Sequence, residues 1–227
     1  MSSYAKRWAV GDEKSVPHVH LDVGSADKSR MLIETERLLL RPLLASDLEP
    51  YAALMADPEV VRHLGGKPYT RDEAAGALAL MMERFANDGY GQVAIVRKAD
   101  RRFLGRCGLL VWELPAWRPT SHLEARGPTE TEIAWRLAHA YWGNGYATEA
   151  AAAVRDYAFA TLGLTRLISL ITPANSRSIA VARRIGMELE KEVTINDRRT
   201  LVYATAGPSR PRARSRLASR PSRSAML

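Results

Sequence analysis

The 227-residue chain has very little cysteine and no long apolar run. Cys107 is its only cysteine, which excludes an intrachain disulfide and suits a reducing compartment. It lies in a strand-like run and is expected to be a small buried residue. No apolar stretch approaches the length that spans a bilayer, and residues 1–30 are too polar for a secretory signal. We therefore expect a cytoplasmic protein that does not enter membranes.

Acidic residues are missing from the C-terminal end of the chain. Residues 207–227 contain six arginines and no Asp or Glu, and residues 1–30 contain five basic and four acidic residues. The 33 basic and 25 acidic residues of the chain therefore leave 22 and 21 for residues 31–206. A basic nucleic-acid-binding face is therefore not expected on this nearly neutral region. Composition predicts a disordered extension over residues 1–30, one domain over 31–206 and a disordered Arg/Ser/Pro-rich tail over 207–227. The tail either has no function, which we favour, or binds nucleic acid through its charge.

The chain also lacks the common signatures of covalent and metal-dependent catalysis. There is no Gly-x-Ser-x-Gly elbow and no paired Cys and His signature of a thiol enzyme. His18 and His20 form an H-x-H pair, but no further ligand cluster lies near them in the sequence. No metal site is therefore expected.

The spacing of apolar residues predicts a single α+β domain with helices on both faces of one mixed sheet. Strands are expected over residues 37–41, 92–97, 103–112, 131–137, 166–172, 188–194 and 200–204. Helices are expected over residues 46–56, 70–86, 148–162 and 176–185. Ser46 and Thr70 each precede a Glu by three residues, which predicts two capping boxes. Residues 114–129 are expected to form a long loop, whose Trp117 and His122 either line a cleft or, as we favour, lie on the surface.

Residues 142–150 join a predicted strand to an alanine-rich helix through Gly143 and Gly145. A glycine turn before a helix presents unpaired N–H groups at the positive end of the helix dipole, which favours a phosphate or another anion. The two glycines let the backbone approach that anion, because they have no Cβ. The same pattern also occurs in turns that bind nothing, so this segment alone leaves both interpretations open.

Several segments together resemble the GCN5-related N-acetyltransferase (GNAT) superfamily, and more narrowly its RimJ/RimL-like branch. They follow the family's order over residues 31–206 and comprise residues 34–42, 57–60, 132–137, 142–150, 175–178 and 184–187. The resemblance implies a central, mostly antiparallel sheet with splayed middle strands and helices on both faces. It also implies direct transfer of the acetyl group of acetyl-CoA to a primary amine in a ternary complex, without a metal.

The resemblance assigns the glycine turn to the pyrophosphate of CoA. The superfamily pattern Gln/Arg-x-x-Gly-x-Gly/Ala falls on Trp142, Gly145 and Ala147, with Trp142 in place of the usual Gln or Arg. Because the contact is made mainly by backbone groups, we expect binding to survive this replacement. The cofactor-binding residues that the resemblance implies are Leu137, Ala138, Trp142, Gly143, Asn144, Gly145, Tyr146, Ala147, Thr148 and Asn175. Leu137 and Ala138 would bond pantetheine through their backbone, and Asn175 would bond it or a nearby water while also capping a helix.

An amine attacks a thioester only in its neutral form, so a base must accept a proton. Glu132, on the strand beside the expected cleft, is the first candidate, and Glu130 is a weaker one; a solvated strand-end carboxylate is the alternative for Glu132. The tyrosine that many superfamily members carry on the later helix is replaced by Ala182. RimJ/RimL-like enzymes resemble this chain in having a serine at the Ser178 position. Its hydroxyl either bonds the departing sulfur or lies on the helix surface without a role.

The amine acceptor is not specified by the sequence and is either a protein N-terminus or a small amine. Residues 62–69 and 114–129 are expected to shape its site. The alternative function is a non-catalytic acyl-CoA-binding regulator of the same fold. We expect a monomer or a homodimer.

Overall fold

The computed structural model describes residues 31–64 and 67–208, and the predictions for residues 1–30 and for the tail beyond residue 208 lie outside it. The described residues build one nine-stranded sheet in the order β1-β2-β3-β4-β6-β7-β9-β8, with β5 paired to β4. The strands are β1 (Ile33–Glu34), β2 (Leu38–Pro42), β3 (Gln92–Arg97), β4 (Phe103–Glu113), β5 (Arg118–Thr120), β6 (Thr129–Leu137), β7 (Arg166–Ile171), β8 (Glu188–Ile195) and β9 (Arg198–Ala206). Every pair is antiparallel except β6 with β7, which is parallel.

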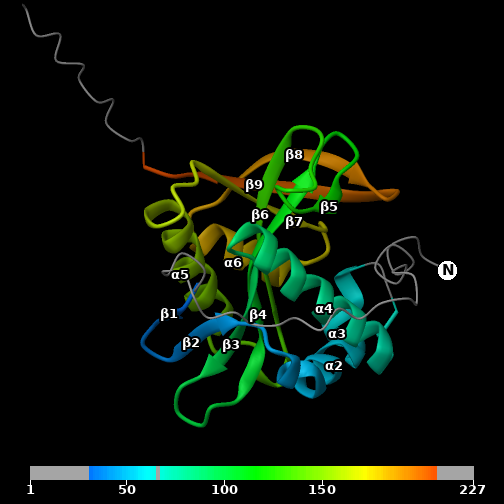
Figure 1. Cartoon of the computed structure of the whole chain (residues 1–227). Helices are drawn as coiled ribbons and strands as arrows, with labels where there is room; N and C mark the ends of the chain where they lie inside the picture. Colours follow the sequence, from blue (N-terminus) through cyan, green and yellow to red (C-terminus); the bar gives the residue numbers. More distant parts are fainter. Residues whose placement is uncertain (1–30, 65–66, 209–227) are drawn as a thin grey trace, which may run out of the picture.

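Helices cover both faces of this sheet (Figure 1). On one face lie α2 (Leu48–Ala56), α3 (Pro58–Val61) and α4 (Arg71–Asp88), and on the other lie α5 (Tyr146–Ala160) and α6 (Ser176–Arg184). Short 3-10 turns are formed by η1 (Ala45–Asp47), η2 (Arg62–Leu64) and η3 (His139–Tyr141). The mixed α+β fold predicted from the sequence is therefore confirmed, with β1, β5 and α3 as additional short elements.

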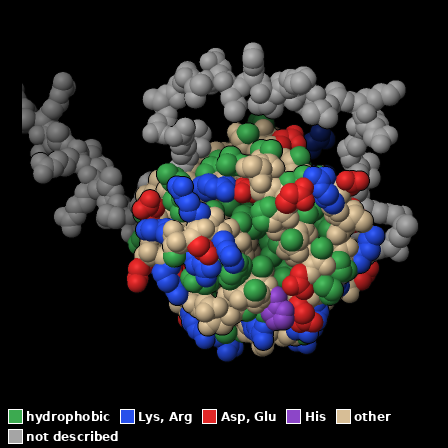
Figure 2. Space-filling model, turned by 90° about the horizontal axis from the view of Figure 1, so that it is seen from below, with side chains coloured by type: hydrophobic (Ala, Val, Ile, Leu, Met, Phe, Trp, Pro, Cys, Tyr) green, Lys and Arg blue, Asp and Glu red, His purple; other side chains and the backbone are tan. Residues whose placement is uncertain are grey.

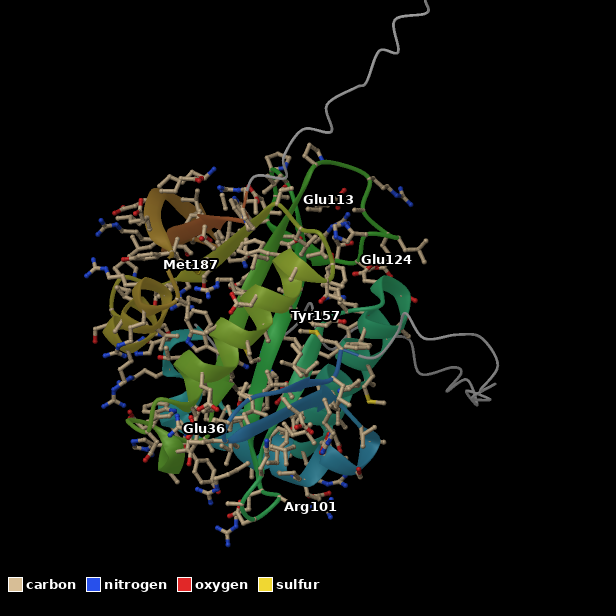
Figure 3. The ribbon with its side chains drawn as sticks, turned by 90° about the vertical axis from the view of Figure 1, so that its left-hand side faces the viewer. Glu36, Arg101, Glu113, Glu124, Tyr157 and Met187 are labelled. Carbon is tan, nitrogen blue, oxygen red and sulfur yellow. The ribbon has the colours of Figure 1, made fainter. Side chains whose placement is uncertain are left out.

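The helix α5 packs closely on the sheet through small residues. Ala150, Ala151, Val154 and Ala158 have no exposed surface. Figure 3 shows α5, marked by Tyr157, running across the face of the strands. Small side chains allow this close approach because little volume separates the helix backbone from the strands. The alanine-rich helix expected over residues 148–162 is confirmed as α5.

The cysteine also has its predicted place. Cys107 lies on β4 in the core beneath α5 and is fully buried. Burial raises the pKa of its thiol to about 12, so the thiolate that would react is strongly disfavoured.

One of the two predicted capping boxes is correct. Thr70 Oγ1 accepts the Glu73 N–H at 3.2 Å, while the Glu73 carboxylate accepts the Thr70 N–H at 2.8 Å. The box at Ser46 is wrong, because the buried Asp47 fixes this turn instead. Asp47 accepts the Leu44 N–H at 2.9 Å and two bonds of 2.7 Å from the Arg41 guanidinium. A 3-10 turn therefore precedes α2.

The predicted loop over residues 114–129 is shorter than expected, because β5 and the first residue of β6, Thr129, lie within it. β5 extends the sheet beside the end of β4. The ring Nε2 of His122 lies 2.5 Å from the hydroxyl of Tyr90. The backbone N–H of His122 donates to the Asp88 carboxylate at 2.8 Å. These contacts tie the segment to the end of α4.

The surface carries charges of both signs. On the face shown in Figure 2, hydrophobic side chains gather near the middle, and basic and acidic side chains are spread around them. None of the helices in the part of the chain described here is long and apolar enough to cross a membrane.

We predict opposite stability effects for two Gly→Ala substitutions. Gly105 on β4 has φ +152°, and a Cβ there would clash with the Arg136 carbonyl and lie 2.7 Å from the Leu137 Cα. Gly105→Ala should therefore lower the free energy of unfolding by about 1–3 kcal/mol. Gly76, on the exposed face of α4, has no atom within 4 Å of the equivalent position, so Gly76→Ala should raise it by about 0.5–1 kcal/mol. Urea denaturation measures both, and effects of equal sign would contradict this account.

Candidate active site

The two middle strands of the sheet separate at Glu132. β6 pairs with β4 along its whole length, but its pairing with β7 consists of one register pair, Glu132 with Ile168. Over residues 133–137, β6 therefore has no paired strand on its β7 side among the described residues. This is the splay of the middle strands that the resemblance implies.

The edge of β6 presents backbone groups to this gap. The Ala138 N–H donates to the Leu104 carbonyl at 2.9 Å, so Gly105 and Leu137 form a pair without mutual hydrogen bonds. The N–H and C=O of Leu137 therefore point away from β4, and the two-residue alternation gives Trp135 the same orientation. Trp135 was missed by the sequence reasoning, although this alternation could have identified it. The Ala138 amide, in contrast, is already engaged within the sheet.

The gap opens into a cleft of about 1450 Å³. This volume exceeds the roughly 300–1,000 Å³ of a site for one small ligand, so two substrates can be accommodated together. One half of the cleft is formed by β6, the start of α5 and the start of α6. The other half is formed by residues of α2, α3, η2 and α4 with the turn between β8 and β9. From the predicted loop 114–129, only Pro119 contributes to the lining, and Trp117 and His122 do not.

The glycine turn places an uncapped helix start at the cleft. Gly143 and Gly145 have φ of +79° and +80°, values that favour glycine. Gly145 is the N-cap of α5, and no side chain caps this helix. The N–H groups of its first turn, from Tyr146 to Thr148, therefore lack the usual helical partners. Since these residues line the cleft, the turn forms an anion-binding position.

Arg37, which precedes β2, holds this turn in place. Its guanidinium bonds both the Glu149 carboxylate in α5, at 2.6 Å, and the Asn144 carbonyl, at 3.0 Å. The Arg37 N–H also donates to Glu149 at 3.0 Å, and the guanidinium lies 4.5 Å from the centre of the Tyr146 ring. The sequence reasoning missed this role, because these partners are more than one hundred residues away along the chain.

The side chains of Trp142 and Asn144 stabilise the turn by bonding its backbone carbonyls. Trp142 donates from its indole N–H to the Leu137 carbonyl at 2.8 Å, and its ring lies 4.8 Å from the Arg177 guanidinium of α6. The side-chain amide of Asn144 donates to the carbonyls of Tyr141 and Trp142, at 3.2 and 3.0 Å. Trp142 lines the cleft, whereas Asn144 does not.

The start of α6 also faces the cleft. Asn175 is its N-cap, and its side-chain oxygen accepts the Ser178 N–H at 3.1 Å. The capping role expected of Asn175 is therefore confirmed. Both residues line the cleft, and within the described part of the chain no hydrogen bond engages the Ser178 hydroxyl.

Glu132 is a buried carboxylate at the point where the strands separate. It is 6% exposed, which rules out a solvated strand-end carboxylate. One oxygen accepts the Leu170 N–H at 3.1 Å, and the other accepts the Trp112 indole N–H at 2.7 Å. Burial raises the pKa of Glu132 to about 7. Glu130, the weaker candidate, forms an ion pair with Arg166 at 3.1 Å and does not line the cleft.

Comparisons with known proteins agree with this architecture. The family model of the acetyltransferase (GNAT) domain matches residues 37–188. The uncharacterized protein YkkB of Bacillus subtilis (strain 168) is 31% identical over 173 residues, covering 74% of this chain and 92% of YkkB. An acetyltransferase crystal structure from Agrobacterium tumefaciens strain C58 is 31% identical with a TM-score of 0.63, covering 84% of this chain and 99% of that one.

A structure of RimL, a ribosomal L7/L12 alpha-N-protein acetyltransferase in complex with coenzyme A, shares the fold at 16% identity and a TM-score of 0.62. The alignment covers 78% of this chain and 98% of RimL. From the extent of the family match, the chain belongs to the GNAT family of acetyl-CoA-dependent N-acetyltransferases.

Proposed function

We propose that the protein transfers the acetyl group of acetyl-CoA directly to a primary amine, carried by a small molecule or a protein N-terminus, within a ternary complex. The observation that carries this proposal is Glu132. It is a buried carboxylate with a pKa of about 7, inside the cleft and at the separation of β6 and β7. A base whose pKa lies near the working pH is effective in proton transfer. Acetyl-CoA supplies the acetyl group as an activated thioester.

The cleft half beside α5 and α6 fits the cofactor. A Cβ on Gly143 would meet no atom within 4 Å, and one on Gly145 would meet only the Arg37 guanidinium at 3.5 Å. The glycines thus face open space beside the helix start, where the N–H groups of residues 143–148 would bind the pyrophosphate. Arg177 and Arg184, which line the same half, add positive charge for the phosphates.

The edge of β6 fits the pantetheine arm. The Leu137 N–H and the backbone of Trp135 would bond its amide groups, and the side-chain N–H₂ of Asn175 would donate from the opposite side. Ala138 could contribute only its carbonyl, because its N–H is engaged with Leu104. Asn144 would act mainly by bracing the turn through its side chain.

Glu132 would accept the proton of the attacking amine, directly or through a water. Its two N–H partners, on Trp112 and Leu170, stabilise the ionised form and fix the carboxylate. Each carboxylate oxygen has a second lone pair, so a proton can still be received. Ser178, at the start of α6, would donate a hydrogen bond from its hydroxyl to the departing sulfur.

Replacement of the base gives a direct test. We expect Glu132→Gln to lower kcat by about 100-fold or more while the Kd for acetyl-CoA stays unchanged. The matched control is Glu130→Gln, two residues away on β6 and outside the cleft. Release of CoA thiol with a panel of amines measures turnover, and calorimetry measures binding. Binding of acetyl-CoA without thiol release from any amine would instead favour the non-catalytic regulator.

The pH dependence of kcat/KM tests the role of Glu132 independently. Because Glu132 must be ionised to act as a base, kcat/KM of the wild type should rise with pH and level off above about pH 7. An acceptor whose own amine is neutral over this range isolates the enzyme's titration. A flat profile with such an acceptor would remove Glu132 as the base.

The pyrophosphate position is tested at the glycine turn. Gly145→Glu places a carboxylate at the anion site and should weaken CoA binding by at least about 100-fold. Gly89→Glu is the matched control, because Gly89 has φ +73° and equally open surroundings but lies at the end of α4, outside the cleft. Equal CoA affinity in the two variants would refute the assignment.

The role of Ser178 is tested separately. Loss of one hydrogen bond to the departing sulfur should lower kcat of Ser178→Ala about tenfold at saturating amine. The control is Ser176→Ala, at the first residue of α6, for which no contact to the sulfur is proposed. Unchanged turnover in Ser178→Ala would exclude Ser178 from the mechanism.

A further inference from the structure

The side chains beside Glu132 on its face of the sheet are apolar. In the register of β4 and β6, Glu132 lies directly opposite Leu110, and Ala134 is the next residue of β6 on the same face. Directly opposed residues bring their Cβ atoms to within about 4.5–5.5 Å. Trp112, two residues beyond Leu110, donates its indole N–H to Glu132 at 2.7 Å. All four residues line the cleft, so a group that reaches the carboxylate also contacts an apolar surface.

The helix α4 covers this part of the sheet. Ala77 and Met81 are one turn apart, so they share a face of the helix, and both line the cleft. Arg84, one turn further along α4, donates to the Pro119 carbonyl at 3.1 Å. Pro119 is the register partner of Trp112, so this bond holds the end of α4 beside the same end of β4. Met81 and Trp112 therefore enclose one region of the cleft.

We call this region the apolar pocket. It consists of Ala77, Met81, Leu110, Trp112 and Ala134. Leu110 and Ala134 are only partly buried, and they line the cleft, so part of their apolar surface stays accessible from it. Covering apolar surface with an apolar group contributes about 25 cal/mol for each Å² removed from water. The pocket therefore favours an apolar occupant.

The charged side chains of this half lie further from Glu132. Arg136 is four residues away on the same strand face, about 13 Å between Cα atoms at roughly 3.3 Å per residue. Arg106 is the register partner of Arg136, so it lies equally far along the sheet. Arg62 and Glu59 are exposed and form an ion pair at 3.2 Å. These charges can contact only the distant part of an acceptor whose amine faces Glu132.

Carboxylates are scarce in the cleft. Within residues 31–64 and 67–208, the acidic residues of the lining are Glu59, Glu132 and Glu149. Glu59 pairs with Arg62, and Glu149 is bonded to Arg37 beside the glycine turn. The further ammonium groups of a polyamine would therefore meet only carboxylates that already have a partner.

We propose that the acceptor is a primary amine with an apolar group next to its amino carbon, and that this group occupies the apolar pocket while the amine faces Glu132. This inference rests on the proposed function and names its substrate class. An amine that reaches Glu132, directly or through one water, holds its first substituent against Leu110, Trp112 or Ala134. An alkylamine and a peptide with an apolar first residue both present such a group.

The test compares acceptors of nearly equal size that differ in polarity. The first arm uses pentylamine and 4-aminobutan-1-ol, and the second uses Leu-Gly-Gly-amide and Asn-Gly-Gly-amide. With rates expressed per neutral amine, kcat/KM should be at least about tenfold higher for the apolar member of one arm, and the favoured arm identifies the source. Spermidine should be a poor acceptor. Equal rates within both pairs, or a preference for spermidine, would overturn the inference and leave the acetyltransferase activity standing.

Variants connect the preference to the pocket. Leu110→Asn makes the surface opposite Glu132 polar, so the apolar-to-polar ratio of kcat/KM should fall towards one, with the Kd for acetyl-CoA unchanged. Leu110→Met keeps an apolar surface and should retain the ratio. Val111→Thr is the matched control, because Val111 packs in the core on the opposite face of β4 and does not line the cleft. An unchanged ratio in Leu110→Asn would contradict the proposal.

A binding measurement keeps the inference separate from catalysis. Pentan-1-ol and butane-1,4-diol correspond to the first pair of acceptors with a hydroxyl in place of the amine. Pentan-1-ol should bind the acetyl-CoA complex of the wild type at least about tenfold more tightly than the diol, and Leu110→Asn should bind the two about equally, as measured by ligand-observed NMR. If no amine is acetylated but the alcohols follow this pattern, the proposed reaction fails and the apolar pocket stands. If pentan-1-ol binds the wild type no more tightly than the diol, the apolar pocket is wrong.

Discussion

The hydrogen bond from the Leu170 N–H to the Glu132 carboxylate is the contact on which this site depends. Beside the single β6–β7 register pair, the Glu132 side chain accepts the Leu170 N–H of β7. A paired strand would otherwise accept this hydrogen bond. The gap between the strands thus opens without leaving this N–H unpaired, which would be costly in the interior. The contact fixes the carboxylate at a buried position, where burial raises its pKa to about 7 although the Leu170 N–H itself lowers it.

The half of the cleft beside α5 and α6 is assembled from segments that are distant in the chain. Arg37 joins the start of β2 to the Asn144 carbonyl and to Glu149 of α5, and Arg177 of α6 stacks on Trp142. These contacts hold the glycine turn in place. The Trp142 indole bonds the Leu137 carbonyl, so we expect the turn to keep its shape although Trp142 stands in place of the Gln or Arg of the superfamily pattern.

Local patterns were predictable from the sequence, and contacts between distant segments were not. The Thr70 capping box, the alanine-rich helix α5 and the glycine turn depend on neighbouring residues, and the structure contains all three. The Ser46 box failed because Arg41, on another element, captures Asp47. Likewise, the burial of Glu132 requires Trp112, and the opposition of Arg106 and Arg136 requires the β4–β6 register. Neither can be read from spacing within one segment.

The two halves of the cleft present positive potential by different means, and Glu132 lies between them. The half beside α5 and α6 has backbone N–H groups at a helix start, whereas guanidinium groups line the other half. Burial raises the pKa of Glu132, and the charges of Arg106 and Arg136 oppose that rise.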